Sequence, residues 1–320
     1  MLKSHRIKVG ITMGDPSGIG PAITLAAVNR LKGLADFVII GDKWVLNQVS
    51  GVRCQVSGVT FIDLRNVTRK NFSFGKIKAE YGRASIQYLD KALELIRSKE
   101  IDCLVTCPIS KEAINKAGFI YAGHTEYLSE RTHCRDLVMM LLNKRLKFSL
   151  VTRHIPLQSV SSRISRKGLY KTILLTISSL KKFFLIREPR IVVCGLNPHA
   201  SDNGLIGSEE NKVIKPLLQR LRRRVRNLTG PISADVAIAK ANRQEFDCVI
   251  AMYHDQALIP LKLYGDFSGV NITLGLPFVR TSPLHGTAFD IARYPSRANP
   301  RSLIEAIKLA VKCASNLKKD

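Results

Sequence analysis

The chain has 320 residues, 45% of them hydrophobic and 23% charged, so it can bury a core, and its length favours two lobes. Its formal net charge is +25, but the basic residues are spread along the chain and no zinc-finger, homeodomain or RNP-like pattern occurs. This distribution argues against a dedicated nucleic-acid-binding protein. Apolar runs such as "FVII" are far too short to cross a bilayer, which argues against a membrane protein.

The N-terminus and the cysteines indicate the compartment. The segment "MLKSHRIKVGITMG" passes from basic residues directly into a strand-like run, without the apolar region or cleavage site of a signal peptide. The seven cysteines are odd in number and include no C-x-x-C pair, which argues against a disulfide framework or a thiolate zinc site. We therefore expect a cytoplasmic protein.

The first third of the chain alternates strands and helices. Strands are predicted at residues 7–14, 36–41, 59–64 and 101–108, and helices at 22–31 and 85–98. In the second helix, Ile86, Leu89, Leu93 and Ile96 recur at the spacing of one helix face. Strands that alternate with helices of this length predict a parallel sheet covered on both faces.

The pattern changes near residue 123. Two apolar runs around "NKR" predict an antiparallel hairpin over residues 137–152. Further strands are predicted at 190–197, 248–253 and 269–275, and helices at 168–184, 208–224, 234–246 and 300–317. We expect a boundary near residue 123, with the last helix returning to the first lobe.

Polar motifs follow several of these strands. "GDPSGIGP" joins a strand to a helix, where free N–H groups can bind an anion, but it matches no nucleotide fingerprint and the glycines alone can serve a tight turn. In "AGHTEYLSE", Thr125 can cap a helix, whereas His124 lies beside the helix N-terminus and can bind phosphate.

Three histidines each follow a predicted strand. His154, His199 and His254 would share one sheet edge if those strands lie in one sheet. Taken singly, each histidine is most simply a hydrogen-bonded structural residue. Together they form the ligand set of a catalytic divalent metal with an open position.

The last part of the chain supplies polar residues for an anion. Arg280 can hold a carboxylate or phosphate through two hydrogen bonds, Lys262 can act as a point charge, and Asn271 lies between them in the sequence. A surface role is the alternative for each cation.

Five long motifs resemble those of the 4-hydroxythreonine-4-phosphate dehydrogenase family of vitamin B6 biosynthesis, in order and approximate spacing. They are "ITMGDPSGIGP", "GHTEYL", "NPHASDNGLIGSEE", "YHDQALIPLK" and "NITLGLPFVRTS" followed by "HGTAFDIA". The last segment also looks like the adenine-side loop of the isopropylmalate and isocitrate dehydrogenases, whose two-lobed fold the family shares. The resemblance implies that fold, with α/β/α layers and an active-site cleft between the lobes. We expect a first α/β lobe from residues 1–122 plus about 290–320, and a second from 123–289 with the dimer interface.

The resemblance also implies the cofactors and the residue roles. It implies a homodimer with active sites at the subunit interface, a divalent metal (Zn, Mg or Co) and NAD, with NADP as the alternative. The metal ligands fall on His154, His199 and His254, and the substrate contacts on His124, Thr125, Lys262, Asn271 and Arg280. The dinucleotide is assigned to His285, Gly286, Thr287, Ala288 and Asp290.

The implied reaction is the NAD-dependent oxidation of 4-phosphooxy-L-threonine at C3, followed by metal-assisted decarboxylation to 3-amino-1-hydroxyacetone phosphate. Asp235 and Asp255 are the candidates for the general base. One alternative is a sister dehydrogenase acting on 4-phospho-D-threonate or 4-phospho-D-erythronate. The other is a catalytically silent basic binding protein, because "ARYPSRANP" after "DI" departs from the family pattern, as do Ala22, Val236 and Leu284.

Overall fold

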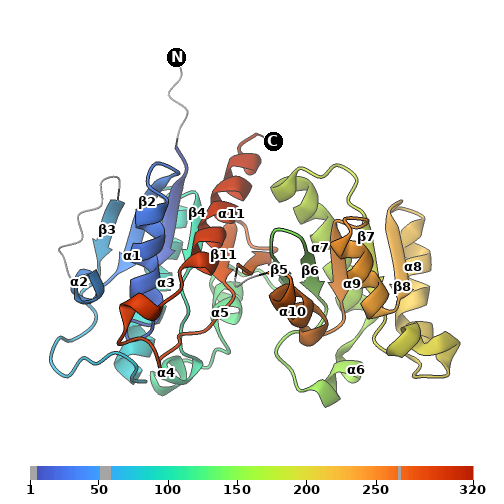
Figure 1. The fold of residues 1–320 in the computed structure, drawn as a ribbon, viewed down its shortest axis with the longest axis horizontal. Helices are drawn as coiled ribbons and strands as arrows, with labels where there is room; N and C mark the ends of the chain where they lie inside the picture. The colour runs from blue at the N-terminus through green and yellow to red at the C-terminus, as the bar shows by residue number, and fades with distance from the viewer. Residues whose placement is uncertain (1–5, 51–58, 266–267, 320) are drawn as a thin grey trace. The chain divides into compact units, whose positions relative to one another are not determined.

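The computed structural model describes residues 6–50, 59–265 and 268–319 (Figure 1). They form two compact units, the first within residues 1–135 and 276–319 and the second within residues 136–275. Residues 123–135 and 276–289, which the sequence analysis placed in the second lobe, therefore belong to the first unit. The reason is packing: Tyr127 joins a buried cluster with Ile86, Leu89 and Ile114, and residues 279–281 pair with an adjacent strand of the first unit.

The first unit contains a parallel sheet. Its strands follow the order β3-β2-β1-β4-β11, and every pair is parallel, so all carboxyl ends lie at one edge. The strands are β1 (Lys8–Thr12), β2 (Asp36–Gly41), β3 (Val59–Asp63), β4 (Cys103–Thr106) and β11 (Val279–Pro283). The first four were predicted, but β11 was not recognised as a strand.

Helices cover both faces of this sheet. The helices are α1 (Gly20–Arg30), α2 (Lys43–Ser50), α3 (Ala79–Arg97), α4 (Lys111–Lys116), α5 (His124–Arg131) and α11 (Arg301–Leu317), with a short 3-10 turn at Pro295–Arg297. Helix α1 packs against α2 and α11, whereas α3 packs against α4 (Figure 1). The C-terminal helix returns to the first unit as predicted, because Leu303 and Ile307 are fully buried and Thr281 Oγ1 donates to the Ala306 carbonyl at 2.8 Å.

The second unit contains a mixed sheet. Its order is β10-β5-β6-β9-β7-β8, in which β5 is antiparallel to both β10 and β6, while β6, β9, β7 and β8 are mutually parallel. The strands are β5 (Val138–Leu142), β6 (Lys147–Leu150), β7 (Ile191–Cys194), β8 (Leu228–Ile232), β9 (Cys248–Ala251) and β10 (Val270–Leu274). The predicted hairpin is confirmed, and Asn143 Oδ1 closes it by accepting from the Arg145 and Leu146 amides at 2.8 Å.

The second unit has helices close to the predicted ranges 168–184, 208–224 and 234–246, and two further helices, at residues 160–163 and 254–263, that were not predicted. They are α6 (Val160–Arg163), α7 (Arg166–Phe184), α8 (Lys215–Arg222), α9 (Ala234–Asn242) and α10 (His254–Leu263), with 3-10 turns at Leu157–Ser159 and Pro198–Gly204 and a π-turn at Glu210–Ile214. Ser165 caps α7 by accepting from the Gly168 amide at 3.1 Å. Both units thus confirm the predicted α/β class.

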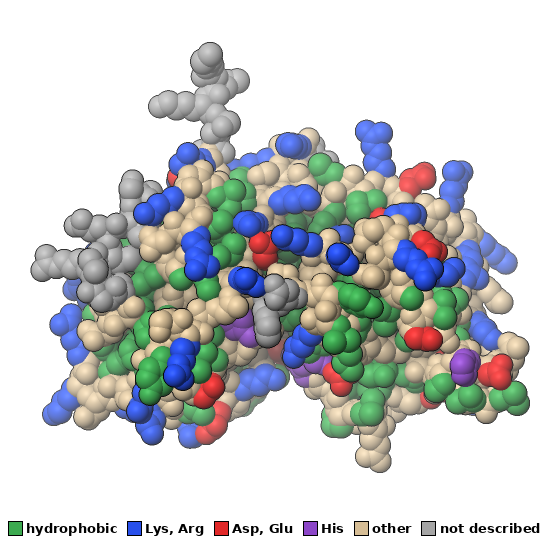
Figure 2. All heavy atoms as spheres, viewed as in Figure 1, with side chains coloured by type: hydrophobic (Ala, Val, Ile, Leu, Met, Phe, Trp, Pro, Cys, Tyr) green, Lys and Arg blue, Asp and Glu red, His purple; other side chains and the backbone are tan. Residues whose placement is uncertain are grey.

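The surface of the described parts carries many basic side chains, as the net charge of +25 predicts. Lysine and arginine side chains spread over both units on the face that Figure 2 shows. Within residues 6–50, 59–265 and 268–319, no helix is long and apolar enough to cross a membrane.

Candidate active site

A buried arginine lies in the sheet of the first unit. Arg280 on β11 is 2% exposed and pairs in register with Leu104 of β4. Its Nε donates to Thr106 Oγ1 at 3.1 Å and its Nη2 donates to the same oxygen at 2.5 Å. Burial lowers the pKa of Arg280 to about 10, and the Glu126 carboxylate opposes that shift. The guanidinium is therefore still charged at neutral pH. The first unit thus contains a buried cation that is held in place by hydrogen bonds to Thr106.

A histidine lies beside this arginine at the start of α5. Burial lowers the pKa of His124 well below 6.5, the charge of Arg280 lowers it further, and a backbone hydrogen bond with Cys107 acts in the opposite direction. The imidazole is thus neutral at pH 7. Its Nε2 is buried and has no hydrogen-bond partner among the residues that the structure describes. An unpaired buried nitrogen is costly, so this atom is suited to a ligand.

Thr125 is not the helix cap that one interpretation of the sequence suggested. The helix begins at His124, Gly123 occupies the cap position with φ 158°, and no side-chain cap is formed. Thr125 is the second helical residue and is 7% exposed. Thr125 is therefore a buried polar residue of the first unit, as His124 and Arg280 are.

Two of the three candidate metal ligands lie together in the second unit. His154 follows β6 and His254 opens α10 after β9, the strand next to β6. Their ring centroids are 5.6 Å apart with an interplanar angle of 55°. Asp255 Oδ1 lies 2.6 Å from His254 Nδ1, so Nε2 is the ring nitrogen of His254 that this contact does not use. A carboxylate on the second nitrogen is the usual support of a metal-binding imidazole.

His199 follows β7, the next parallel strand beyond β9, in an exposed loop of unusual conformation. His199 and the four residues after it are all left-handed, with φ between 41° and 70°. The loop is anchored by buried Glu210, whose Oε1 accepts from the Leu196 and Asn197 amides at 2.8 Å. Within residues 6–50, 59–265 and 268–319 no group of three or more His, Cys, Asp or Glu side chains is placed to hold a metal. The chain alone thus pairs His154 with His254 and leaves His199 outside that pair.

The other predicted residues of the second unit are spread over three elements. Lys262 is exposed in the last turn of α10, and Asn271 is 8% exposed on β10. Asp235 is exposed in the first turn of α9. Asp255, the other candidate base, is 64% exposed and is engaged with His254. That contact favours an orienting role for Asp255 and leaves Asp235 as the candidate base.

The glycine loop after β1 serves a tight turn. Asp15 Oδ1 accepts from the Ser17 amide and from Ser17 Oγ, both at 2.9 Å. The Gly18 amide donates to the Asp15 carbonyl and the Ile19 amide donates to the Thr287 carbonyl at 2.9 Å. These amides are therefore not available to an anion, and the structural interpretation of "GDPSGIGP" holds for them.

The candidate dinucleotide loop packs against this turn. Besides the bond from Ile19 to Thr287, a Cβ at Gly18 would lie 3.0 Å from the Thr287 carbonyl oxygen. Ala288 is left-handed with φ 44°, Gly286 has open space around it, and Asp290 is exposed. Burial lowers the pKa of His285, whose Nε2 has no hydrogen-bond partner among the described residues. The loop therefore contains a neutral imidazole whose Nε2 could accept a hydrogen bond from a ligand or donate one to it.

Thr106 and Glu210 were missed by the sequence analysis. Thr106 ends β4 as a polar residue in an otherwise apolar strand, which was a usable signal. Glu210 offered none, because an acidic residue near a helix start is usually exposed.

Comparisons with known proteins identify the family of the chain. Residues 31–310 match the family of the pyridoxal phosphate biosynthetic protein PdxA. The chain is 43% identical to a 4-hydroxythreonine-4-phosphate dehydrogenase of Sulfurihydrogenibium sp., with 95% of this chain and 98% of the relative covered. It is 38% identical to a D-threonate 4-phosphate dehydrogenase of Salmonella typhimurium, with 96% and 98% covered. A crystal structure of a Klebsiella pneumoniae 4-hydroxythreonine-4-phosphate dehydrogenase matches with a TM-score of 0.86 at 32% identity, with 98% and 99% covered.

Proposed function

The chain belongs to the pyridoxal phosphate biosynthetic protein PdxA family, and on this premise we propose that it is an NAD-dependent 4-hydroxythreonine-4-phosphate dehydrogenase of the cytoplasm. Its substrate is 4-phosphooxy-L-threonine. The C3 hydroxyl loses its proton to a base, and the C3 carbon transfers its hydrogen as a hydride to the nicotinamide of NAD+, which gives a 3-keto acid and NADH. Loss of carbon dioxide from that β-keto acid and reprotonation yield 3-amino-1-hydroxyacetone phosphate, a precursor in the synthesis of pyridoxal 5'-phosphate.

The buried Arg280 is the observation that supports this proposal most directly. The Arg280 guanidinium is 2% exposed and donates to the Thr106 hydroxyl, so its position in the first unit is fixed. The substrate is anionic at both ends, and a guanidinium can bind either a phosphate or a carboxylate through two bonds. His124 Nε2 and the Thr125 hydroxyl supply neutral hydrogen-bonding groups on the same unit. Lys262 and Asn271 are proposed as further substrate contacts, as the resemblance to the family implies.

The His154–His254 pair fits a divalent metal in chemistry and in spacing, since two imidazoles 5.6 Å apart can face one cation. A metal ion bound there would lower the pKa of the C3 hydroxyl and stabilise the negative charge that forms as carbon dioxide leaves. Asp255 fixes the orientation of His254, and Asp235 is the proposed base. The proposed ion is Zn, Mg or Co, and the proposed dinucleotide is NAD, as the resemblance to the family implies.

We assign the third ligand to His199 of the second protomer in a homodimer. The support is that one chain, among its described residues, places His154 beside His254 but forms no group of three metal-ligating side chains. His199 lies in an exposed loop on the neighbouring strand, where a second copy can reach it.

Subunit complementation tests this arrangement. His199→Ala and His254→Ala should each abolish NADH formation and weaken bound metal, and His133→Asn should be a neutral histidine control. Mixed dimers of the two inactive variants contain one intact site if ligands are exchanged between protomers, so about a quarter of wild-type activity should return on statistical mixing. If the three ligands came from one chain, no activity would return. A His199→Ala variant that is active without metal would refute the proposed metal site.

Arg280→Ala tests the substrate contact. We expect KM for the phosphorylated substrate to rise at least about tenfold, because a charge-assisted bidentate contact is lost. KM for NAD+ should stay unchanged. Equal KM values for the phosphorylated substrate in the variant and the wild type would exclude Arg280 from the substrate site.

A sister activity on D-threonate 4-phosphate is the second candidate, favoured by the 38% identity to the Salmonella typhimurium enzyme of that name. NADH formation with 4-phosphooxy-L-threonine, D-threonate 4-phosphate and D-erythronate 4-phosphate in parallel separates these activities. Any turnover also excludes the catalytically silent basic binding protein.

A further inference from the structure

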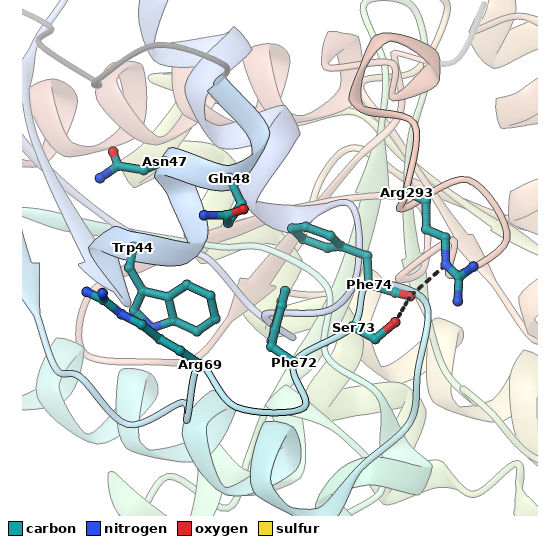
Figure 3. A pocket seen from close by; sticks show the side chains of 8 residues that line it. All are labelled: Trp44, Asn47, Gln48, Arg69, Phe72, Ser73, Phe74 and Arg293. Atoms are coloured by element: carbon teal, nitrogen blue, oxygen red, sulfur yellow. Dashed lines mark hydrogen bonds between the residues drawn. The ribbon is translucent and has the colours of Figure 1, made fainter.

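The first unit contains a pocket of about 630 Å³ beside the candidate dinucleotide loop. It is formed by the start of α2, residues 69–74 and Arg293, whose Nε donates to the Phe74 carbonyl at 3.2 Å (Figure 3). That pocket is therefore part of the proposed dinucleotide site. A second pocket, also of about 630 Å³, lies within the second unit, and the proposed chemistry does not use it.

The second pocket, here called the basic pocket, lies between α7 and α8. It is lined by residues 166–174 of α7, by residues 216–221 of α8 and by residues 223–225, which follow α8. Helix α7 also packs against the π-turn at Glu210–Ile214, from which α8 continues. The volume lies within the range of about 300–1,000 Å³ that is typical of small-molecule sites.

The polar lining of the basic pocket carries only positive charge. None of its charged residues is in an ion pair with an acid among the residues that the structure describes. Residues 160–187 and 211–234 contain no Asp or Glu, so the charge is not neutralised locally. The five cations, all exposed, are Arg166, Lys167, Arg220, Arg223 and Arg224.

Helix stability accounts for only part of this charge. Arg220 and Arg223 lie at the C-terminal end of α8, where the helix dipole favours cations. Arg166 and Lys167 instead follow the N-cap Ser165 of α7, where the dipole favours anions. Two cations at that end are unfavourable for α7, and an anionic ligand in the pocket would offset their repulsion.

The rest of the lining is mostly apolar. Leu217 and Leu221 of α8 are buried, and Leu174 of α7 is half-buried. Tyr170 adds an aromatic ring that is 44% exposed. Arginines bind phosphate oxygens through paired hydrogen bonds, and an apolar surface favours an apolar or aromatic body. The combination suits a small organic phosphate.

One arginine of the basic pocket is bonded to the turn that anchors the His199 loop. Arg166 Nη2 donates to the Lys212 carbonyl of the π-turn at 2.8 Å. Glu210 of the same turn holds the loop, because its Oε2 accepts from Asn197 Nδ2 at 2.9 Å in addition to the amide contacts of Oε1. Hydrogen bonds and one short turn thus connect the pocket with the loop. Such π-turns within helices frequently occur at functional sites.

We propose that the basic pocket binds a small organic phosphate and that this ligand, by fixing Arg166, stabilises the π-turn that anchors the His199 loop. This effector site goes beyond the proposed dehydrogenase function and does not depend on it. Other occupants fit less well. A second copy of the chain also carries a net charge of +25 and is repelled, and a nucleic acid would find only the Tyr170 ring for stacking.

Calorimetry with phenyl phosphate as the probe, at about 0.15 M salt, tests the site. An Arg220→Ala/Arg224→Ala variant should bind the probe at least about tenfold more weakly than the wild type. An Arg187→Ala/Arg226→Ala variant is the matched control. It loses the same charge from exposed positions outside the pocket and should keep the wild-type Kd. Probe that binds at Arg280 instead would give an event that both variants retain.

Amide hydrogen exchange tests the connection with the turn. With the probe at about ten times its Kd, exchange of residues 208–214 should slow by up to about tenfold, because the ligand stabilises the closed turn. Arg166→Ala, compared at the same saturation, should lose this protection because its bond to the Lys212 carbonyl is gone. All substituted arginines are exposed, and circular dichroism will show that the variants fold.

Each outcome decides one part of the proposal. Equal Kd values in the wild type and Arg220→Ala/Arg224→Ala overturn the site, and inorganic phosphate that binds as tightly as phenyl phosphate overturns the organic ligand. A single-stranded oligonucleotide or poly-L-glutamate that needs these arginines, where phenyl phosphate does not bind, overturns the small-molecule assignment. Binding without slower exchange supports the site and refutes the connection. None of these measurements requires NADH formation, so failure of the dehydrogenase assay leaves them unaffected.

Discussion

Replacing Asp15 with asparagine is expected to stabilise the protein above pH 6 and to leave its stability nearly unchanged at pH 4. Asp15 is fully buried, and while Oδ1 accepts two bonds from Ser17, Oδ2 has no hydrogen-bond partner among the described residues. Burial raises the pKa of this carboxyl from 3.8 to about 6, against the opposing effect of the Ser17 hydrogen bonds. The protonated form is therefore the one that the fold prefers.

The sign and the size follow from linkage. Because the folded-state pKa exceeds the unfolded one, stability is greatest below pH 3.8 and falls as the pH rises through about 6. The rise from 3.8 to about 6 corresponds to about 3 kcal/mol, at 1.36 kcal/mol for each tenfold change in acidity. Asparagine is neutral at every pH and keeps an oxygen for Ser17. The stability gain of Asp15→Asn should thus grow from near zero at pH 4 to at most about 3 kcal/mol at pH 8.

Urea unfolding of the wild type and Asp15→Asn at pH 4, 6 and 8 measures this gain. Asp136→Asn is the control, because that side chain is 71% exposed and its ion pair with Lys171 is worth about 1 kcal/mol or less. A difference between wild type and Asp15→Asn that stays constant from pH 4 to pH 8 would refute the reasoning. It would mean that burial does not raise the pKa of this carboxyl above its value in the unfolded chain.

Two further substitutions test the packing around the site. Thr106→Val removes the oxygen that accepts both hydrogen bonds from Arg280 and keeps the shape of the side chain. We expect a loss of about 1–3 kcal/mol in unfolding free energy and a higher KM for the phosphorylated substrate, with kcat nearly unchanged. Thr106→Ser should restore both the stability and the KM. Gly82→Ala would place a Cβ 2.1 Å from the Ala113 carbonyl oxygen, so α3 and α4 must separate at a cost of about 1–3 kcal/mol. Gly286→Ala, which meets nothing within 4 Å, is the stability control, and equal melting temperatures for the two glycine variants would contradict the packing argument.

The sequence predicted most strands of both sheets because their apolar runs are short and bounded by turn residues. Two strands escaped. β8 contains Gly230 and Pro231, residues that rarely occur inside strands, so its pattern resembles a loop. β11 contains Arg280, and a buried arginine breaks the apolar alternation that identifies a strand. Both strands were missed for the same reason: their extended conformation is determined by pairing with neighbouring strands and by tertiary hydrogen bonds, and not by local sequence propensity.

The candidate site was predictable in its parts but not in its assembly. Strand ends could be located, so His154 and His254 were correctly expected on one sheet edge. The left-handed run that begins at His199 could not be foreseen in detail, although its Asn, Asp and Gly content suits that conformation. Thr106 beneath Arg280 required the pairing of two segments 174 residues apart, which local patterns do not encode.

The first unit is built from both ends of the polypeptide, and this affects the order of biogenesis. During translation, residues 136–275 leave the ribosome as a continuous stretch and can form their sheet at once. The N-terminal part must wait for residues 276–319, which bring β11 and α11 to β4. Until then the newly made segment exposes an unfinished sheet edge beside β4. A premature stop codon shortly after residue 275 would thus remove β11 and α11 from the half of the enzyme that was synthesised first.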